Sequence, residues 1–484
     1  FSLAKNNTTT VLEYCGPNTN KPLHLGHIRN MLLGYSTAQL LSYAGNDVHK
    51  VNIYNDRGIA ICKSMLAYKL FGNGETPGST GIKSDHFVGK YYVEFDKKHK
   101  AQIAELIANG VDKKDAEEEA PLMKQAREML LQWEAGDKET KDLWLKMNNW
   151  CYEGFEQTYE ALGVDFEKHY KESDYFEQGK KEVLKGLKEG KFEQHKDGSV
   201  WVDLEDKGLD KKILLRSDGT SVYITQDIGV AEARYKDYHY DNSIYVVADE
   251  QNYHFKVLKL TLEKLGKPYA EGIHHLSYGL VNLPDGRMKS REGTVVDADD
   301  LIAKMIATAQ KHTEELGKVE DFTEEEAKKL YKTLAMGALK YFILKVNPKK
   351  SMIFNPEESI DFQGDTGPFV QFNYVRIQSL LRKQTVGEID TTKVSLTAEE
   401  KELIKILYKY KPVIQQAAIN FDVSMITSYS YELAKGFSKF YSSTSILNVE
   451  EENTKNFRLQ LSAYVANTLK SSFAILGIDM PERM

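Results

Sequence analysis

The amino-acid sequence predicts an α/β domain with a parallel sheet and a helical insertion, followed by an all-α helical bundle domain. Three observations support this prediction. A strand, a helix and a second strand succeed one another between Val11 and Tyr54, which is the order of a βαβ unit with parallel strands. A mainly helical stretch then separates this unit from strands that resume at about residue 191. From about Glu320 onward the pattern is almost wholly helical.

The composition is that of an ordinary globular protein and excludes few classes of function. The 484 residues suffice for two to four domains, and 28% of them are charged and 41% hydrophobic. The net charge of −7 neither supports nor excludes a nucleic-acid partner, because a local basic face is enough to bind one. No apolar run approaches ~18 residues, so we expect neither a membrane span nor a signal peptide.

The three cysteines indicate the redox compartment. Cys15, Cys62 and Cys151 are far apart and form no CxxC pair. This pattern favours reduced thiols in the cytoplasm over a disulfide or zinc framework. The chain begins at Phe1 and not at Met, with only about a dozen residues before the first motif, so we expect a truncated product.

The first predicted strand leads directly into the strongest candidate site. Val11 to Tyr14 is the end of a short buried strand, and Gly16 to Asn18 breaks it into a loop. His24 opens a helix whose apolar residues recur at helical spacing as far as Leu40. A strand, a glycine-bearing loop and a helix N-terminus together form a favourable site for phosphate oxygens.

Two histidines lie at the start of this predicted helix. His24 and His27 are three residues apart and point the same way, while Gly26 between them lets a ligand approach the backbone. A histidine pair alone is more often structural than functional. No cysteine or acidic residue stands nearby at metal spacing, so we predict no metal site here.

The second strand and the insertion follow. Asp47 to Tyr54 alternates and is rich in β-forming residues, which predicts a strand. Helices are expected at about Tyr91 to Asn109 and Leu122 to Ala135, and a third carries an apolar stripe ending at Leu162. We interpret the acidic run Asp112 to Glu119 as a solvated helix face or loop.

Strands return after the insertion. Lys191 to Glu205 predicts a hairpin that turns at Asp197-Gly198, and Ile213 to Asp227 predicts a second one. Ser243 to Ala248 is an apolar strand typical of a buried parallel sheet. Gln251 and His254 follow at its carboxyl end, where such sheets bind ligands.

A cationic loop follows the next predicted strand, His274 to Val281. The loop from Leu283 to Thr294 contains Lys289 and Arg291. A cation that closes over departing phosphate oxygens stabilises the transition state more than the ground state. Without further context, a basic surface loop is the simpler interpretation.

The remainder of the chain predicts an amphipathic helical bundle. Gln371 to Lys383 carries Tyr374 and further apolar residues on one stripe, with Arg376 and Arg382 nearby. Three more amphipathic stretches follow at residues 399–418, 424–441 and 456–476.

The string PNTNKPLHLGH, residues 17–27, resembles the "HIGH" signature of class I aminoacyl-tRNA synthetases in the form typical of arginyl enzymes. The loop at residues 283–294 resembles the "KMSKS" loop of the same class, but Ser290 stands where its second lysine is expected. The resemblance implies that Lys21 compensates as a phosphate-binding cation. The segment DTGPFVQFNYVRIQSLLRK resembles the start of the family's anticodon-binding domain, and GIDMPERM resembles its usual C-terminus.

The resemblance implies a division into domains. Residues 1–71 and 191–300 are expected to form a Rossmann-like catalytic domain, and residues 72–190 a mainly helical insertion. Residues 301–360 are expected to form a linking region that contacts the tRNA stem, and residues 361–484 the anticodon-binding domain.

The resemblance also implies residue roles. Catalysis is expected from His24, His27, Lys21, Lys289 and Arg291. The ATP site is expected at His24, Gly26, His27, His254, Gly279 and Lys289. Arginine is expected to contact Glu13, Asn18, Tyr223, Asp227 and Gln251, since carboxylates and amide oxygens suit a planar guanidinium. The tRNA is expected to contact Tyr374, Arg376, Arg382 and Lys383.

The implied activity is that of an arginine–tRNA ligase. Arginine is activated by ATP with Mg²⁺, and the arginyl group passes to tRNA(Arg). We expect a cytoplasmic monomer with no membrane partner. Three alternatives remain: another class I synthetase such as a cysteinyl type, a non-catalytic tRNA-binding paralogue, and a nucleotidyltransferase that shares only HxGH. The missing zinc-spaced cysteines, the retained His24, His27 and basic loop, and the C-terminal helices respectively count against them.

Overall fold

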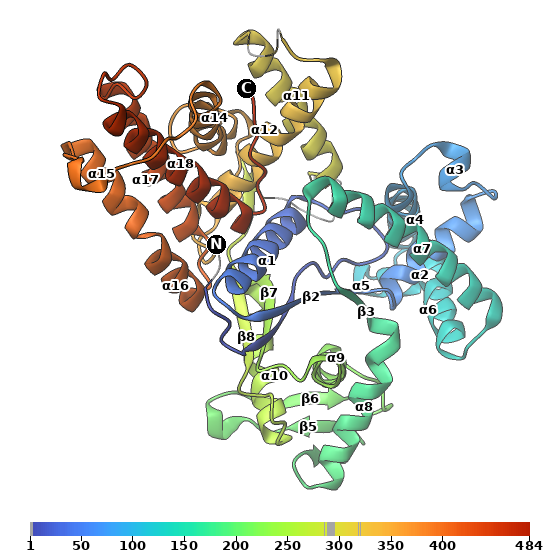
Figure 1. Ribbon diagram of the computed structural model, residues 1–484. Helices are drawn as coiled ribbons and strands as arrows, with labels where there is room; N and C mark the ends of the chain where they lie inside the picture. The colour runs from blue at the N-terminus through green and yellow to red at the C-terminus, as the bar shows by residue number, and fades with distance from the viewer. Residues whose placement is uncertain (1–2, 285, 288–295, 318, 320) are drawn as a thin grey trace.

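The computed structural model describes residues 3–284, 286–287, 296–317, 319 and 321–484, and a parallel five-stranded sheet lies at its centre (Figure 1). The strand order is β3-β2-β1-β7-β8, and every neighbouring pair runs parallel. From β1 the chain adds strands first on one side, β2 and then β3, and later on the other side, β7 and then β8. Such sheets bind ligands at the point where this order reverses, between β1 and β7. Because β1 and β2 are parallel neighbours with a helix between them in the chain, the predicted βαβ unit is confirmed. The strands are β1 Thr9–Glu13, β2 Asp47–Tyr54, β3 Lys168–Lys171, β7 Asn242–Ala248 and β8 Ile273–Tyr278.

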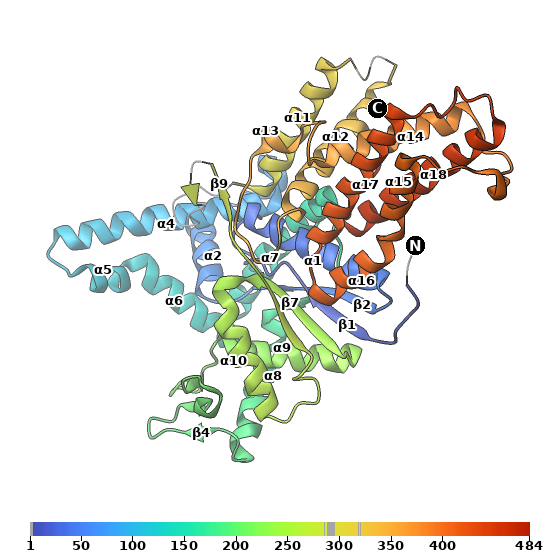
Figure 2. The ribbon, with the colours of Figure 1, turned by 90° about the vertical axis from the view of Figure 1, so that its left-hand side faces the viewer.

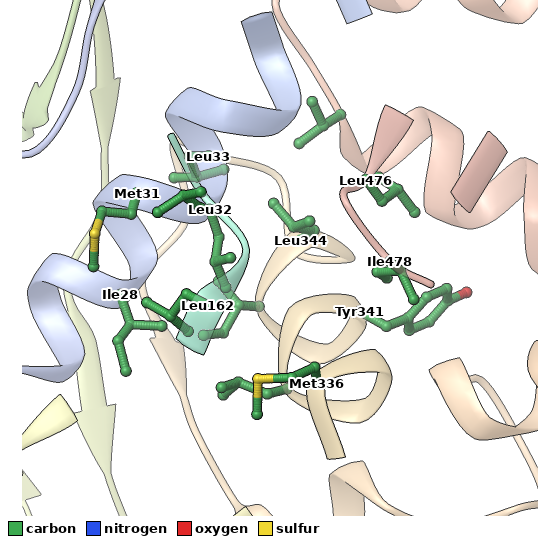
Figure 3. Close-up of a cluster of buried hydrophobic side chains, with 14 of the residues drawn as sticks. Ile28, Met31, Leu32, Leu33, Leu162, Met336, Tyr341, Leu344, Leu476 and Ile478 are labelled. Atoms are coloured by element: carbon green, nitrogen blue, oxygen red, sulfur yellow. The ribbon is translucent and has the colours of Figure 1, made fainter. Parts of the chain in front are cut away.

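Helix α1, Leu25–Tyr43, connects β1 to β2 and packs between the sheet and the C-terminal helices (Figure 1). Gly34 permits this packing, because a Cβ there would approach the Tyr14 side chain to 2.3 Å. One buried hydrophobic cluster joins α1 to α7, α12 and the end of the chain (Figure 3). Its labelled members are Ile28, Met31, Leu32, Leu33, Leu162, Met336, Tyr341, Leu344, Leu476 and Ile478.

The other face of the sheet is covered by α8 Glu172–Lys188, α9 Tyr223–Tyr238 and α10 Asn252–Lys264. Val11 and Val51 of the sheet share a hydrophobic core with Ile228 of α9 and Leu258 of α10. The alternating directions of side chains along β1 explain this division, since its odd and even residues face opposite cores.

The insertion forms a helical unit, and α4 to α6 extend away from the sheet (Figure 2). The expected helices are confirmed. The acidic run at residues 112–119 lies in and just before α5, where Ala116 alone is buried, so its interpretation as a solvated helix is confirmed. The helices are α2 Ile59–Phe71, α3 Pro77–Thr80, α4 Ser84–Ala108, α5 Lys113–Glu119, α6 Pro121–Glu134 and α7 Lys138–Leu162.

The range expected for the insertion, 72–190, contains one strand of the central sheet. β3 pairs with β2 from Val51–Lys168 to Tyr54–Lys171, and α8 then covers the sheet. The sequence pattern concealed this strand because it is a four-residue edge strand, KHYK, with a single fully buried side chain.

A small antiparallel sheet follows, built from β4 Glu193–Gln194, β5 Val200–Val202 and β6 Lys212–Leu215. The first predicted hairpin is confirmed. The second is wrong beyond its turn, because only a single bridge joins Leu215 to Ser221 and the chain then enters α9 at Tyr223. The Thr225 side chain bonds to the Leu214 carbonyl, which holds the start of this helix against β6.

The C-terminal third is helical as predicted, with one exception. β11 Met352–Ile353 pairs with β9 Val281–Leu283, which also pairs with β10 Gly286–Arg287. Among the described residues, no helix is both long and apolar enough to cross a membrane. Short 3₁₀ turns are η1 Glu205–Lys207, η2 Asp249–Gln251 and η3 Thr391–Lys393. The helices are α11 Ala298–Glu315, α12 Glu324–Leu344, α13 Pro356–Ser359, α14 Gly367–Lys383, α15 Ala398–Tyr408, α16 Tyr410–Asn420, α17 Ser424–Ser443 and α18 Glu452–Ile475.

Candidate active site

The two histidines of the first motif cap the helix that they begin. His24 occupies the N-cap of α1, and its Nδ1 accepts a hydrogen bond from the Gly26 N–H at 3.1 Å. His27 Nδ1 accepts one from the His24 N–H at 3.1 Å. Each ring thus satisfies a backbone donor that the helix itself leaves unpaired. With both Nδ1 atoms accepting, each neutral ring carries its hydrogen on Nε2, which can donate to a ligand.

The protonation state of these rings follows from burial. Burial lowers the pKa of His24 to about 4, and the nearby Lys21 also lowers it. Burial lowers the pKa of His27 well below its usual range, with smaller contributions from His24 and Lys21. Both rings are therefore neutral at physiological pH and offer hydrogen bonds without positive charge.

Lys21 supplies the cation at this site. It is half-buried and forms no ion pair with any carboxylate in the described part of the chain. Burial lowers the pKa of Lys21, which is the expected effect of desolvating an ammonium. An ammonium of this kind gains most from a ligand that brings negative charge.

The start of α1 is also tied to the residues that follow the basic loop. The Leu25 N–H donates to Val296 O, and the Ala298 N–H donates to Leu23 O, both at 3.0 Å. Residues 288–294 of this loop, including Lys289 and Arg291, lie outside the described residues. Gly279 precedes it, and a Cβ there would approach the Ser351 nitrogen to 2.5 Å. Close packing against that backbone explains this glycine.

Glu13, at the carboxyl end of β1, is already paired within the protein. Its carboxylate contacts the guanidinium of Arg234 from α9, which is fully buried between the rings of Tyr170 and Tyr245. Burial lowers the pKa of Arg234, but Glu13 outweighs this effect and the net pKa is raised. Burial raises the pKa of Glu13, and the contact with Arg234 opposes this rise.

Asp227 lies one helical turn into α9 and contacts a histidine. His254 Nε2 of α10 lies 2.5 Å from Asp227 Oδ2, and both side chains are about a quarter to a third exposed. Burial lowers the pKa of His254, but the bond to Asp227 outweighs it and the net pKa is raised. His254 was expected at the ATP site, whereas the structure places it on a carboxylate expected to bind arginine.

Glu172 is a further candidate site residue, which the sequence pattern did not indicate. It is the first residue of α8 and is buried, which raises its pKa to about 7. Arg57 lowers this pKa in part, while Asp56 and Asp227 raise it. The missed signal is positional, because Glu172 directly follows the concealed strand β3 at the ligand-binding edge of the sheet.

Close helix packing brings the Glu172 and Asp227 carboxylates near enough for Asp227 to raise the pKa of Glu172, and these two carboxylates define the acidic pocket. Helices α8 and α9 cross at Gly179 and Gly229. A Cβ on Gly179 would approach the Thr225 carbonyl oxygen to 1.7 Å, so the two backbones are in direct contact. The side chain of Gln226 donates a hydrogen bond to Glu172 across this crossing.

The other expected arginine contacts are exposed, at the starts of α9 and α10 and in the loop after β1. Tyr223 begins α9 and is 80% exposed. Asn18 is exposed and pairs through its backbone with Asn55 at the end of β2, and Gln251 is the exposed N-cap of α10. All three remain predictions as ligands.

One group of residues in the described chain has metal-ligand spacing, and it does not fit Mg²⁺. Asp85, His86 and Asp299 have ligand atoms within 4.8 Å of one another. The Lys83 ammonium already occupies this cluster, at 2.7 Å from Asp299 and 3.3 Å from Asp85. A metal ion would have to displace it. The cluster instead fastens α4 to the start of α11.

The expected tRNA contacts differ in their availability. Tyr374 was expected to contact tRNA, but it is only 2% exposed and its hydroxyl bonds to Glu482, because its stripe of α14 faces the core. Arg382 donates to the Glu482 carbonyl at 2.9 Å. Arg376 lies between the rings of Phe372 and Tyr441, 4.7 Å from each centroid. Lys383 is exposed at the end of α14.

Comparison with known proteins shows the family to which this chain belongs. Residues 2–356 match the family described as tRNA synthetases class I (R), catalytic domain, and residues 370–484 match the DALR anticodon binding domain. The chain is similar in fold to an arginyl-tRNA synthetase of Thermus thermophilus, with a TM-score of 0.85 and 24% identity, covering 100% of this chain and 84% of that one.

Two relatives named arginine--tRNA ligase match along nearly the whole chain. The protein from Flavobacterium psychrophilum is 54% identical over 484 residues, covering 100% of this chain and 80% of the relative. The protein from Bacteroides thetaiotaomicron is 53% identical over 479 residues, covering 98% and 80%. This chain therefore belongs to the class I aminoacyl-tRNA synthetases, in the family of the arginine–tRNA ligases.

Proposed function

We propose that the protein activates L-arginine with ATP and transfers the arginyl group to the 3′ end of tRNA(Arg), releasing AMP and pyrophosphate. The observation that carries this proposal is the pairing of two features at one edge of the sheet. Neutral histidine donors and Lys21 lie at the start of α1, and an acidic pocket with Glu172 and Asp227 lies at the starts of α8 and α9.

The acidic pocket suits the arginine side chain. A guanidinium presents its donors in one plane and takes carboxylates in a forked geometry. Glu172 has no cation in hydrogen-bond contact among the described residues, and Asp227 has one oxygen, Oδ1, that accepts no bond there. Lysine would leave acceptors unpaired, at a cost of roughly 1–3 kcal/mol for each buried group.

The activation step requires little more than positioning and charge stabilisation. An oxygen of the arginine carboxylate attacks the α-phosphorus of ATP, and the bond from this phosphorus to the bridging oxygen breaks to release pyrophosphate. His24 and His27 donate hydrogen bonds to phosphate oxygens, and Lys21 offsets their charge. Lys289 and Arg291 are proposed to complete this contact.

The transfer step uses the same groups in a second displacement. The terminal ribose hydroxyl of tRNA attacks the carbonyl of arginyl-adenylate, AMP leaves with the bonding electrons, and the hydroxyl proton passes to a phosphate oxygen of the departing AMP or to water. AMP is a good leaving group, so neither step requires a strong base from the protein. Orientation of the reactants supplies much of the acceleration. A Mg²⁺ ion that accompanies ATP is proposed to be held by phosphate oxygens and water, as is usual for this ion.

We propose the domain roles that the resemblance implies, with the end of the helical insertion moved to an earlier residue. We assign β3 and α8 to the catalytic domain, which leaves about residues 72–163 as the insertion. Residues 361–484 form the proposed anticodon-binding domain, with Arg376 and Lys383 as tRNA contacts. We further propose that the protein is a cytoplasmic monomer. Light scattering of the purified protein measures its molecular mass and so tests whether it is a monomer.

The decisive experiment measures amino-acid specificity. The protein is incubated with ATP, tRNA and each standard amino acid in turn, and acid-precipitable aminoacyl-tRNA is counted. We expect charging with arginine alone. Preferential charging with another amino acid would overturn the assignment. A His24→Ala, His27→Ala double variant measures the background charging without the phosphate contacts, and its circular dichroism checks that it folds.

A further inference from the structure

The carboxylates of the arginine pocket differ in how their charge is offset before substrate binds. Glu13 has Arg234 as a permanent cationic partner. Glu172 has no cation in hydrogen-bond contact in the described chain, and at a pKa of about 7 it is partly protonated near neutrality. Asp227 is intermediate, because its partner His254 can hold or release a proton.

The contact between His254 and Asp227 is well defined. His254 lies in the first turn of α10 and Asp227 lies one turn into α9, and the two side chains meet at 2.5 Å. The His254 ring packs edge-on against Phe255, with ring centroids 5.5 Å apart. This packing and the hydrogen bond together fix the ring beside the pocket.

Among the residues that the structure describes, few other charged groups face His254. Asp227 faces it from α9 and favours its protonated form. From β8, His275 lies close enough for a charge on His254 to lower the pKa of His275. His275 Nε2 is bonded to the Val247 carbonyl at 3.0 Å, so it does not compete for Asp227. The ammonium of Lys212 of β6 is directed at the neighbouring Tyr253 ring, 4.7 Å away.

An imidazolium and a guanidinium satisfy Asp227 in the same way. Both are flat cations that donate N–H groups to carboxylate oxygens. In the described structure His254 occupies Oδ2 and leaves Oδ1 open. A guanidinium arriving at Oδ1 would bring a second positive charge within a few ångströms of a protonated His254.

We propose that His254 is a positioning residue for arginine recognition, holding Asp227 in place and giving up a proton when the substrate guanidinium takes over its charge. This inference rests on the proposed function, since it assigns the guanidinium to Asp227. It assigns His254 to the amino-acid site and not to ATP.

The proton balance is simple. Before arginine binds, the contact with Asp227 favours the protonated form of His254; after it binds, the guanidinium takes over the contact and His254 is neutral. Up to one proton per His254 leaves for solvent. Ionisation of Glu172 on binding releases a further fraction, which is independent of His254. Arginine affinity therefore rises with pH, by up to about tenfold per pH unit for each proton released.

The test is titration calorimetry of the full chain with L-arginine at pH 7, in two buffers of different ionisation enthalpy. The difference in heat gives the number of protons released. The wild type should release more protons than His254→Asn, which keeps a hydrogen-bond donor but cannot titrate. His275→Asn, a neighbouring histidine on β8, is the matched control and should release as many as the wild type.

Each outcome has a defined meaning. Equal proton release by the wild type and His254→Asn would overturn the inference, as would proton uptake by the wild type. If His254→Asn raises the Michaelis constant for ATP strongly and leaves arginine binding unchanged, His254 belongs to the ATP site and the inference is wrong. If His254→Asn fails to fold, His254→Gln takes its place. No binding heat together with no arginine charging by the wild type would instead refute the proposed function.

Discussion

Replacing Glu172 with glutamine tests the acidic pocket most sharply, because the variant keeps the shape and removes one charge. At a separation of about 4 Å and an effective dielectric constant of about 20, a guanidinium and a carboxylate attract each other by about 4 kcal/mol. With a pKa of about 7, ionising Glu172 at pH 7 costs only about 0.4 kcal/mol. We therefore expect Glu172→Gln to lose about 2–4 kcal/mol of arginine recognition, which is roughly a 30- to 1000-fold lower kcat/KM.

The same arithmetic predicts a pH dependence of the wild type. The pKa of Glu172 is raised, so its carboxylate is progressively protonated as the pH falls through about 7, and arginine affinity falls with it. Between pH 8 and pH 6 this group alone lowers kcat/KM for arginine about tenfold. Glu172→Gln should lose this component and keep only the part that belongs to His254.

The assay is tRNA charging at saturating ATP and tRNA with arginine varied, at pH 6, 7 and 8. Glu177→Gln is the matched control, since Glu177 lies on the same helix and is exposed. It should behave as the wild type at every pH. A Glu172→Gln variant within twofold of the wild type at pH 8 would refute the assignment of Glu172 to the guanidinium.

Two further substitutions test the phosphate and tRNA contacts. His27→Ala removes a neutral donor at the start of α1 and should lower turnover roughly a hundredfold or more, with circular dichroism unchanged; near-normal turnover would exclude its role. Arg376→Ala removes a guanidinium held between Phe372 and Tyr441. It should raise the Michaelis constant for tRNA at least about tenfold, the scale of one such contact, and leave that for arginine within twofold; the reverse pattern would contradict the assignment.

The regular elements could be predicted because their signals are local. The apolar spacing of α1, the alternation of β2 and the apolar run of β7 each lie within one short window of sequence. The helix-start histidines could also be found, because strand, loop and helix N-terminus follow one another directly.

The errors share a cause, which is that a local pattern does not reveal its tertiary partner. Tyr374 was assigned both to an apolar stripe and to tRNA, and the packing of α14 decides for the core. The segment at Tyr223 is rich in β-forming residues, yet its bonds to β6 and the close crossing with α8 favour a helix.

The acidic pocket shows the same limit at the level of chemistry. Glu13 pairs with Arg234, 221 positions later in the sequence, and Asp227 pairs with His254 on the next helix. Glu172 follows a short edge strand that carries no apolar run. Only the packed structure brings these groups together, so their charge states could not be inferred from spacing.

The central claim is that the pocket recognises the charge of the guanidinium. Citrulline tests this most directly, because it has the shape of arginine with a neutral urea group. The measurement is the ratio of kcat/KM for arginine to that for citrulline in tRNA charging, for the wild type and Glu172→Gln. We expect a ratio of at least about 10³ for the wild type and a ratio at least tenfold smaller for the variant. Comparable charging of citrulline and arginine by the wild type would contradict the claim.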